Sequence, residues 1–178
     1  MRFLDFLKTA VLLFAGAANA LAVVTIIGAG TEDRVLLYGA FGWWLVAAGV
    51  GGYLGRRRQA FEGVARLMST ARATPALPEL EPGTVLFNRL WALAAFTVVA
   101  GSVGFFLPQV PAIAVGFPLM AALALRRQAP AVEAVEERDG VRFYIERTSA
   151  MRPTQLLRTP GFKKWVDESG EAQRQPAR

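Results

Sequence analysis

The feature that most constrains this chain is an uncharged run from Leu90 to Leu125, which is 36 residues long and is interrupted only at Pro108-Gln109-Val110-Pro111. A helix that spans a bilayer needs about 20 consecutive apolar residues. The run is therefore too long for one such helix and fits two helices joined by a turn that carries both prolines. Because the bilayer core offers no water to satisfy backbone groups, the sequence predicts that this run is helical.

Two further uncharged runs, Thr9 to Thr31 and Val35 to Gly55, each have the length of one span. Charged residues make up 19% of the chain and fall almost wholly between and after the runs, whereas a soluble helix carries them every three or four positions on its outer face. We therefore expect an all-α membrane protein with four transmembrane helices. The short connection at 30–34 makes the first two spans antiparallel neighbours, so the expected arrangement is two helical hairpins.

The predicted segments follow one another along the chain. Spans are expected at 9–29, 35–55, 84–107 and 111–127, with a periplasmic loop at 30–34 and a periplasmic turn at 108–110. Three segments are expected in the cytoplasm, namely residues 1–8, an amphipathic helix and Pro-rich linker at 56–83, and a tail at 128–178. Pro118 lies in the middle of the fourth span and predicts a kink, because proline lacks a backbone N–H.

The distribution of positive charge indicates the orientation. Arg34 is the only one of the 20 basic residues that falls in an expected periplasmic segment. Cytoplasmic loops of membrane proteins carry an excess of Lys and Arg, so both termini are expected in the cytoplasm. The preference for Arg over Lys, together with abundant Ala and Gly, is typical of a GC-rich bacterial genome, which places the protein in the bacterial inner membrane.

The N-terminal segment allows a second interpretation, a cleaved signal peptide. Ala18-Asn19-Ala20 and Ala20-Leu21-Ala22 both resemble signal-peptidase sites. The apolar run continues through Ile27, however, which is longer than the apolar region of a signal peptide and favours an uncleaved helix. The orientation of the later spans is the same in both cases.

The composition excludes several kinds of chemistry. The chain contains no cysteine and no histidine, which removes thiol catalysis, disulfides, His-ligated haem and the usual zinc sites. The uncharged runs 9–31, 35–55 and 90–125 place no charged residue deep in a span, and Arg89, Arg126 and Arg127 lie near the ends of theirs, which argues against proton-coupled transport and voltage sensing. Since no nucleophile and base stand in a recognisable pattern, we expect no enzyme activity, no catalytic residue, no metal and no cofactor.

Four polar or amphipathic residues fall at similar depth in three spans: Asn19, Trp43, Trp44 and Thr97. One interpretation is a small midplane cavity in which Asn19 and an indole N–H bind a ligand. The alternative is that these groups hold helices together, since an interhelical hydrogen bond contributes roughly 1 kcal/mol. The second interpretation is favoured.

Small residues also recur at four-residue spacing within the spans, which lets helices approach closely, within one chain or between copies as a homo-oligomer. They are Ala47, Gly51 and Gly55 in the second span, Ala100 and Gly104 in the third, and Ala112 and Gly116 in the fourth.

The tail contains an alternating segment, Val141 to Glu146, that is typical of a strand. Asp139-Gly140 before it is a strong two-residue turn, so the sequence predicts a β-hairpin whose first strand is Val132 to Glu137. The alternative for that first strand is a short helix from Ala131 to Glu137.

Beyond the strand, basic residues are interleaved with large apolar ones, which predicts a docking arm. The candidate docking residues are Arg147, Arg152, Arg158, Phe162, Lys163, Lys164 and Trp165. Anionic lipid headgroups or a protein of a membrane complex suit such a surface, and no nucleic acid is expected because no binding module surrounds the charges. An arm folded against its own bundle is the alternative.

These features favour a non-enzymatic membrane scaffold or accessory subunit with a basic cytoplasmic docking tail. The second hypothesis is a small membrane binding or transport protein with a midplane pocket for an apolar or lipid-like ligand.

Overall fold

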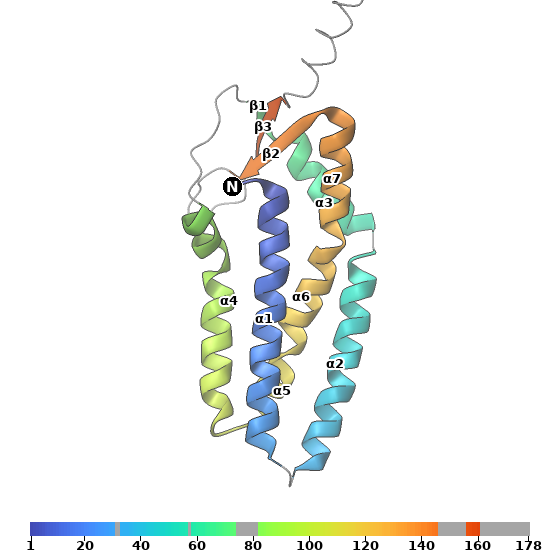
Figure 1. The fold of residues 1–178 in the computed structure, drawn as a ribbon. Helices are drawn as coiled ribbons and strands as arrows, with labels where there is room; N and C mark the ends of the chain where they lie inside the picture. The colour runs from blue at the N-terminus through green and yellow to red at the C-terminus, as the bar shows by residue number, and fades with distance from the viewer. Residues whose placement is uncertain (31–32, 57, 74–81, 146–155, 161–178) are drawn as a thin grey trace, which may run out of the picture.

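The structure is a computed structural model that describes residues 1–30, 33–56, 58–73, 82–145 and 156–160. Within these residues the chain forms helices and three short strands (Figure 1). They are α1 (Phe3–Ala29), α2 (Arg34–Leu54), α3 (Arg58–Ser69), β1 (Arg72–Ala73), α4 (Pro82–Gly104), α5 (Gln109–Ala114), α6 (Gly116–Arg126), α7 (Gln128–Asp139), β2 (Val141–Ile145) and β3 (Leu156–Pro160).

The prediction of four long apolar helices is confirmed. Helices α1, α2 and α4, and the nearly continuous segment from α5 through α7, are each long and apolar enough to cross a membrane. Figure 1 shows that they run side by side, alternately down and up. The N-terminus and all three strands lie at one end of the bundle, and the α1–α2 and α4–α5 connections lie at the other.

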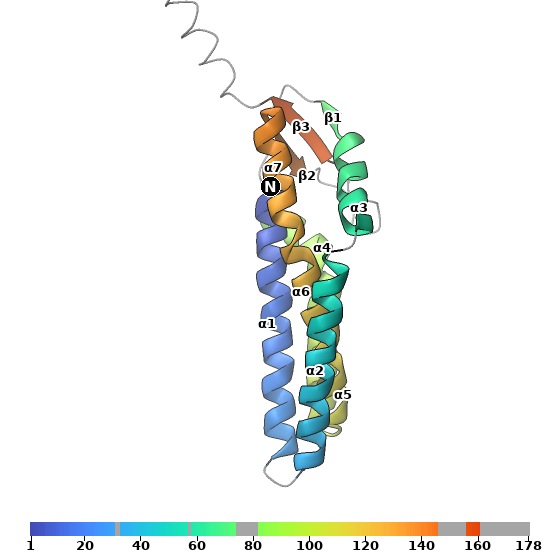
Figure 2. The same ribbon diagram turned by 90° about the vertical axis from the view of Figure 1, so that its right-hand side faces the viewer.

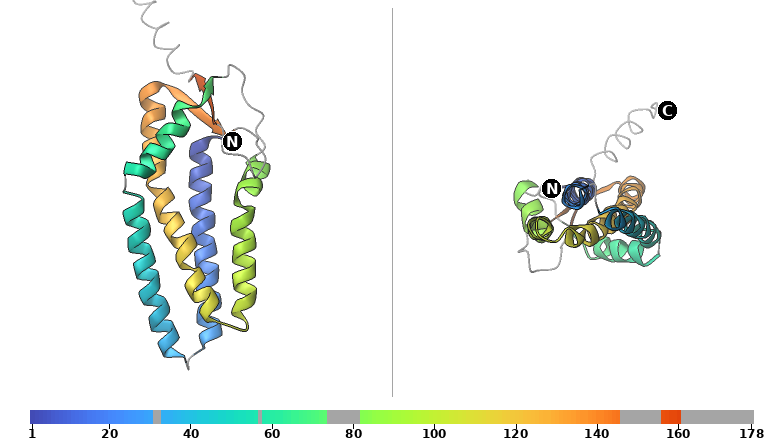
Figure 3. Two further views of the ribbon diagram at one scale, coloured as in Figure 1. Left: turned by 180° about the vertical axis from the view of Figure 1, so that it is seen from behind. Right: turned by 90° about the horizontal axis from the view of Figure 1, so that it is seen from below.

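The segment α5–α6 occupies the centre of the bundle. It packs against both α1 and α2, which contact each other far less than either contacts α6. Helix α4 lies on the other side, against α1 and α5, as the view along the bundle shows (Figure 3). Consecutive helices α1 and α2 are therefore connected by a short loop but are held together mainly through α6.

Small residues account for the close contact between α2 and α6. Ala47 is fully buried, and a Cβ atom added to Gly51 would lie 2.7 Å from the Cα of Met120. A Cβ on Gly55 would lie 3.1 Å from the Cα of Ala124. The backbones of α2 and α6 can approach this closely because these positions lack larger side chains.

The kink expected from Pro118 is an interruption at Val115, which separates α5 from α6. A proline ring clashes with the carbonyl four residues earlier and offers no N–H to it, so the helix breaks just before the proline. That carbonyl belongs to Ala114, the last residue of α5. The break places Pro118 in the first turn of α6, where no intrahelical donor is needed.

The elements outside the long bundle form a compact unit, here called the cap, which consists of α3, α7 and the strands β1, β2 and β3. Strand β3 is central: it pairs in parallel with β1 and antiparallel with β2. Figure 2 shows α3 and α7 beside this sheet. Helix α3 lies in the segment where an amphipathic helix is expected, and its Leu67 and Met68 pack against the cap core.

The predicted hairpin is only partly correct. Val141–Ile145 is a strand, but its antiparallel partner is Leu156–Pro160. Residues 132–137 belong to α7, so the predicted pairing between them and β2 is wrong and the alternative helix is confirmed. Gly140, at φ 60°, ends this helix in the left-handed conformation that glycine commonly supplies at a helix C-terminus.

The start of α1 belongs to the core of the cap. Phe3, Leu4 and Leu7 are buried against Val132 of α7 and Phe143 of β2. The Met1 carbonyl accepts a hydrogen bond from the Ile145 N–H at 3.0 Å, which places the first residues of the chain along the free edge of β2. The cap is therefore built from both ends of the described chain and shares α1 with the bundle.

Candidate functional site

The two adjacent tryptophans of α2 connect that helix to α5. The indole N–H of Trp44 donates to the Ala112 carbonyl at 2.8 Å, and that of Trp43 donates to the Ile113 carbonyl at 3.0 Å. The last four carbonyls of a helix lack intrahelical partners, and both acceptors belong to the last turn of α5. The tryptophans thus donate to backbone carbonyls beside the break that precedes Pro118.

Trp43 also explains why glycine stands at the start of α6. A Cβ atom on Gly116 would lie 2.5 Å from Nε1 of Trp43 and 2.8 Å from its Cε2. The indole ring therefore lies directly on the Gly116 backbone. This arrangement agrees with the interpretation of the tryptophans as groups that hold helices together.

The other two residues of the predicted midplane set point elsewhere. Asn19 is exposed on the outer face of α1, and its side-chain N–H donates to the carbonyl of Ala15 in the same helix at 3.0 Å. The hydroxyl of Thr97 donates to Leu93, also within its own helix. The structure therefore places Trp43 and Trp44 of α2 against α5 but does not gather the four residues around one cavity.

Of the candidate docking residues, only Arg158 lies in the described part of the chain. It is exposed on β3, opposite Phe143 of β2 in the strand register. The remaining candidates, which are Arg147, Arg152, Phe162, Lys163, Lys164 and Trp165, fall outside the described residues.

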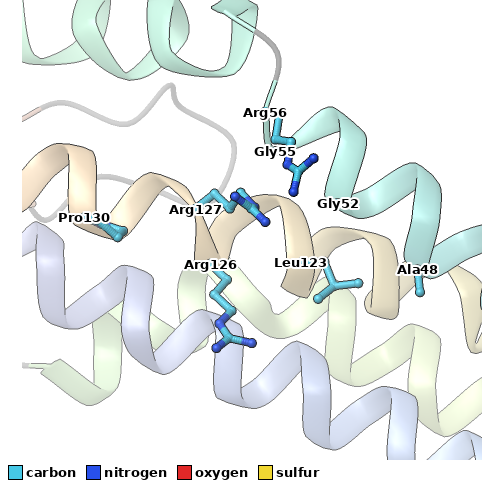
Figure 4. Close-up of a pocket in the computed structure, with 8 residues that line it drawn as sticks. All are labelled: Ala48, Gly52, Gly55, Arg56, Leu123, Arg126, Arg127 and Pro130. Carbon is cyan, nitrogen blue, oxygen red and sulfur yellow. The ribbon is translucent and has the colours of Figure 1, made fainter.

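A basic pocket of about 740 Å³ opens where α2 and α6 end beside the cap. One part of its wall is apolar or small, and the other carries three arginines. The lining residues are Ala48, Gly52, Gly55, Arg56, Leu123, Arg126, Arg127 and Pro130 (Figure 4). In the sequence these arginines indicate only the orientation, because nothing in it shows that α2 and α6 end side by side.

Among the residues that the structure describes, no acid neutralises the charges in this pocket. Figure 4 shows the side chains of Arg56 and Arg127 pointing toward one another, while Arg126 points away toward α1. None of the lining residues is acidic. In the described part of the chain, the ion pairs are Arg2–Glu136 and Arg138–Asp139, and neither involves these three arginines.

An apolar groove of about 520 Å³ lies between α4 and the segment α5–α6. Its lining consists of Ala95, Phe96, Val99, Ala100, Val103, Val110, Ile113, Ala114 and Phe117. The rings of Phe96 and Phe117 meet edge to face across it, with centroids 6.2 Å apart. The groove offers apolar contacts alone and includes no residue of the predicted midplane set.

The cap contains a buried carboxylate that the sequence analysis missed. Glu136 is 8% exposed. One of its oxygens accepts a hydrogen bond from the Arg2 guanidinium and the other from the Phe143 N–H, each at 3.1 Å. A buried carboxylate is stable only when paired and hydrogen-bonded, so Glu136 has a structural role in joining α1, α7 and β2.

No group of three or more acidic residues in the described ranges could hold a metal ion. Comparisons with protein-family models, with curated proteins and with solved structures find no match to this chain.

Proposed function

We propose that this protein is a non-enzymatic scaffold or accessory subunit of the bacterial inner membrane, held in the bilayer by four helices and docking a partner through its cap and basic tail.

Low burial of the long helices supports the membrane location. In the most apolar 18-residue window of each helix, only 17% of the residues of α2 and 11% of those of α4 are buried within the chain. Large apolar side chains such as Val35, Leu45 and Phe87 are more than 70% exposed. A soluble monomer rarely exposes a continuous apolar surface of this kind, and lipid is the medium that accommodates it.

The position of the cap supports the orientation. Arg56, Arg126 and Arg127 lie at the end of the bundle that carries the cap, whereas Arg34 lies at the other end. Basic residues concentrate on the cytoplasmic side of membrane proteins. The cap therefore faces the cytoplasm in this proposal, as do both chain termini.

The observation that carries the docking role is the shared core of cap and bundle. Phe3 and Leu7 of α1 are buried with Val132, Phe143 and Leu156 of the cap. Because the cap is anchored to a transmembrane helix by this core, a partner bound to the cap would be held at a fixed position relative to the membrane. Such rigid presentation suits a scaffold or an accessory subunit.

Deletion of residues 161–178 tests the role of the tail. This deletion removes Phe162, Lys163, Lys164 and Trp165 and leaves the described cap intact, whereas a truncation after Gln128 would also remove α7, β2 and β3. We expect the shortened protein to keep its thermal stability in mild detergent and to lose proteins that co-purify with the full chain from native membranes.

The variant Lys163→Gln/Lys164→Gln/Trp165→Ala removes three of the candidate docking side chains but keeps the full chain length, so it is the counterpart of the deletion. It should lose the same proteins. Retention of every co-purifying protein in both variants would contradict docking by the tail.

The second candidate function is binding of an apolar or lipid-like ligand, and the groove between α4 and α5–α6 favours it. Val99→Trp would fill this groove from one wall. Loss of a co-purifying lipid in that variant, with the protein partners retained, would favour the second function over the first.

A further inference from the structure

Two arginines of the basic pocket lie where one anion would contact both. An arginine side chain stays protonated in proteins, so the facing guanidinium groups of Arg56 and Arg127 repel each other. No carboxylate lines the pocket, and within the described residues neither group has an ion pair. A bound anion between them would turn this repulsion into two favourable interactions.

We propose that the pocket binds the phosphate of an anionic lipid, with Arg56 and Arg127 on the phosphate. Arginine suits this ligand because its planar guanidinium can donate two parallel hydrogen bonds to phosphate oxygens. Ala48, Gly52 and Leu123 form an apolar wall beside the arginines. That wall matches the glycerol and first acyl carbons of a lipid, which a free phosphate lacks.

The size and place of the pocket favour a lipid over a small ion. The volume of about 740 Å³ is many times the roughly 30 Å³ that one water molecule occupies in the liquid. A Cβ added to Gly52 would meet nothing within 4 Å, so the space beside it is open. Arg56 directly follows the uncharged run 35–55, and Arg127 lies two residues after the run 90–125 ends, where the phosphates of the inner leaflet would lie if the helices span the bilayer.

This inference rests on the bilayer location in the proposed function and is independent of docking by the tail. The pocket residues all lie within residues 48–130, and deletion of residues 161–178 leaves them in place. Failure of one proposal therefore does not imply failure of the other.

The test measures lipid binding to the full chain in mild detergent by native mass spectrometry, with phosphatidylglycerol as the anionic lipid and phosphatidylcholine as its neutral counterpart. We expect preferential binding of phosphatidylglycerol, weakened at least about ten-fold in Arg56→Gln/Arg127→Gln because charge-assisted hydrogen bonds are lost. Arg66→Gln/Arg142→Gln removes the same charge from exposed positions in the cap and should bind as the unmodified chain does.

Three outcomes would overturn the proposal. An equal loss in both double variants would mean that the attraction is diffuse, and an undiminished affinity in Arg56→Gln/Arg127→Gln would mean that the lipid binds elsewhere. Equal affinities for inorganic phosphate and phosphatidylglycerol would identify a free anion as the ligand, because the apolar wall would then contribute nothing.

A second variant keeps the test decisive if the double glutamine variant does not remain monodisperse. Gly52→Leu retains the arginines and places a side chain in the open space of the apolar wall. We expect it to fold and to lose phosphatidylglycerol. Normal lipid binding by a folded Gly52→Leu protein would also contradict the proposal.

Discussion

The carboxylate of Glu136 accepts a hydrogen bond from the Arg2 guanidinium at 3.1 Å, although 134 positions separate the two residues in the chain. The Glu136 side chain is 7% exposed and that of Arg2 is 34% exposed. Because the same carboxylate also accepts the Phe143 N–H, it connects the start of α1 with α7 and β2. This pair is the polar counterpart of the apolar core shared by bundle and cap.

Replacement of Glu136 by glutamine should destabilise the cap. In Glu136→Gln an amide oxygen can still accept the Phe143 N–H, but Arg2 loses its charged partner. We expect a loss of about 1 kcal/mol in the free energy of unfolding, since water screens part of the interaction at the one-third exposed Arg2. Thermal unfolding of the protein in detergent measures this change. Glu133→Gln, at an exposed position of the same helix, is the control and should unfold as the unmodified chain does.

The second prediction concerns the contact between α2 and α6. Gly51→Ala places a Cβ 2.7 Å from the Met120 Cα, so the helices must separate, at a cost of roughly 1–3 kcal/mol. Gly49→Ala lies in the same helix and meets nothing within 4 Å. It should be neutral or stabilising by up to about 1 kcal/mol because alanine favours a helix over glycine. Equal unfolding midpoints for the two variants would contradict the close packing.

The third prediction concerns Trp43 and Gly116. Gly116→Ala should lower stability because its Cβ would lie 2.5 Å from the indole Nε1. Trp43→Phe should lower it by about 1 kcal/mol, since the Ile113 carbonyl loses the hydrogen bond from the indole N–H. In the double variant the smaller ring leaves room for the methyl group, so the two losses should sum to less than their separate values. Strict additivity would show that the residues do not interact.

The long helices could be predicted because the chain separates charged from uncharged residues almost completely, and uncharged runs of this length are expected to be helical in a bilayer. The break near Pro118 could be predicted because proline acts locally. Which helices pack against one another could not be predicted, since every span has small residues that suit several partners. The depth of Asn19 could be counted from the ends of its span. The face of α1 on which it lies could not be predicted.

The wrong partner for β2 has a physical reason. A glycine with positive φ serves equally as the second residue of a tight hairpin turn and as the residue that ends a helix. At Gly140 the helix prevails, because α7 continues the direction of α6 and buries Val132 and Glu136 in the cap. The partners of Glu136 and the convergence of Arg56 with Arg127 depend on contacts between distant segments, which local patterns do not reveal.

The fourth prediction distinguishes lipid from a second copy of the chain as the neighbour of Asn19. The side chain faces outward and bonds only within α1. If lipid surrounds it, Asn19→Leu should leave the unfolding temperature unchanged or raise it, because an apolar side chain replaces a polar one. Analytical ultracentrifugation in detergent should show the same molecular mass for both proteins. A drop in mass would instead place Asn19 at a contact between copies, where its amide would hydrogen-bond across helices.

The fifth prediction concerns orientation, and the absence of cysteine from the chain permits a clean experiment. Gln109→Cys introduces a single thiol at the end of the bundle far from the cap, and Glu133→Cys introduces one on α7 of the cap; both positions are exposed. On the proposed orientation, 19 of the 20 basic residues fall on the cytoplasmic side. A membrane-impermeant maleimide should therefore label Gln109→Cys in cells whose outer membrane has been removed and whose inner membrane is intact. It should label Glu133→Cys only after the inner membrane is permeabilised. If Glu133→Cys alone is labelled while the inner membrane is intact, the orientation is the reverse of the one proposed. Labelling of both variants would contradict four complete spans.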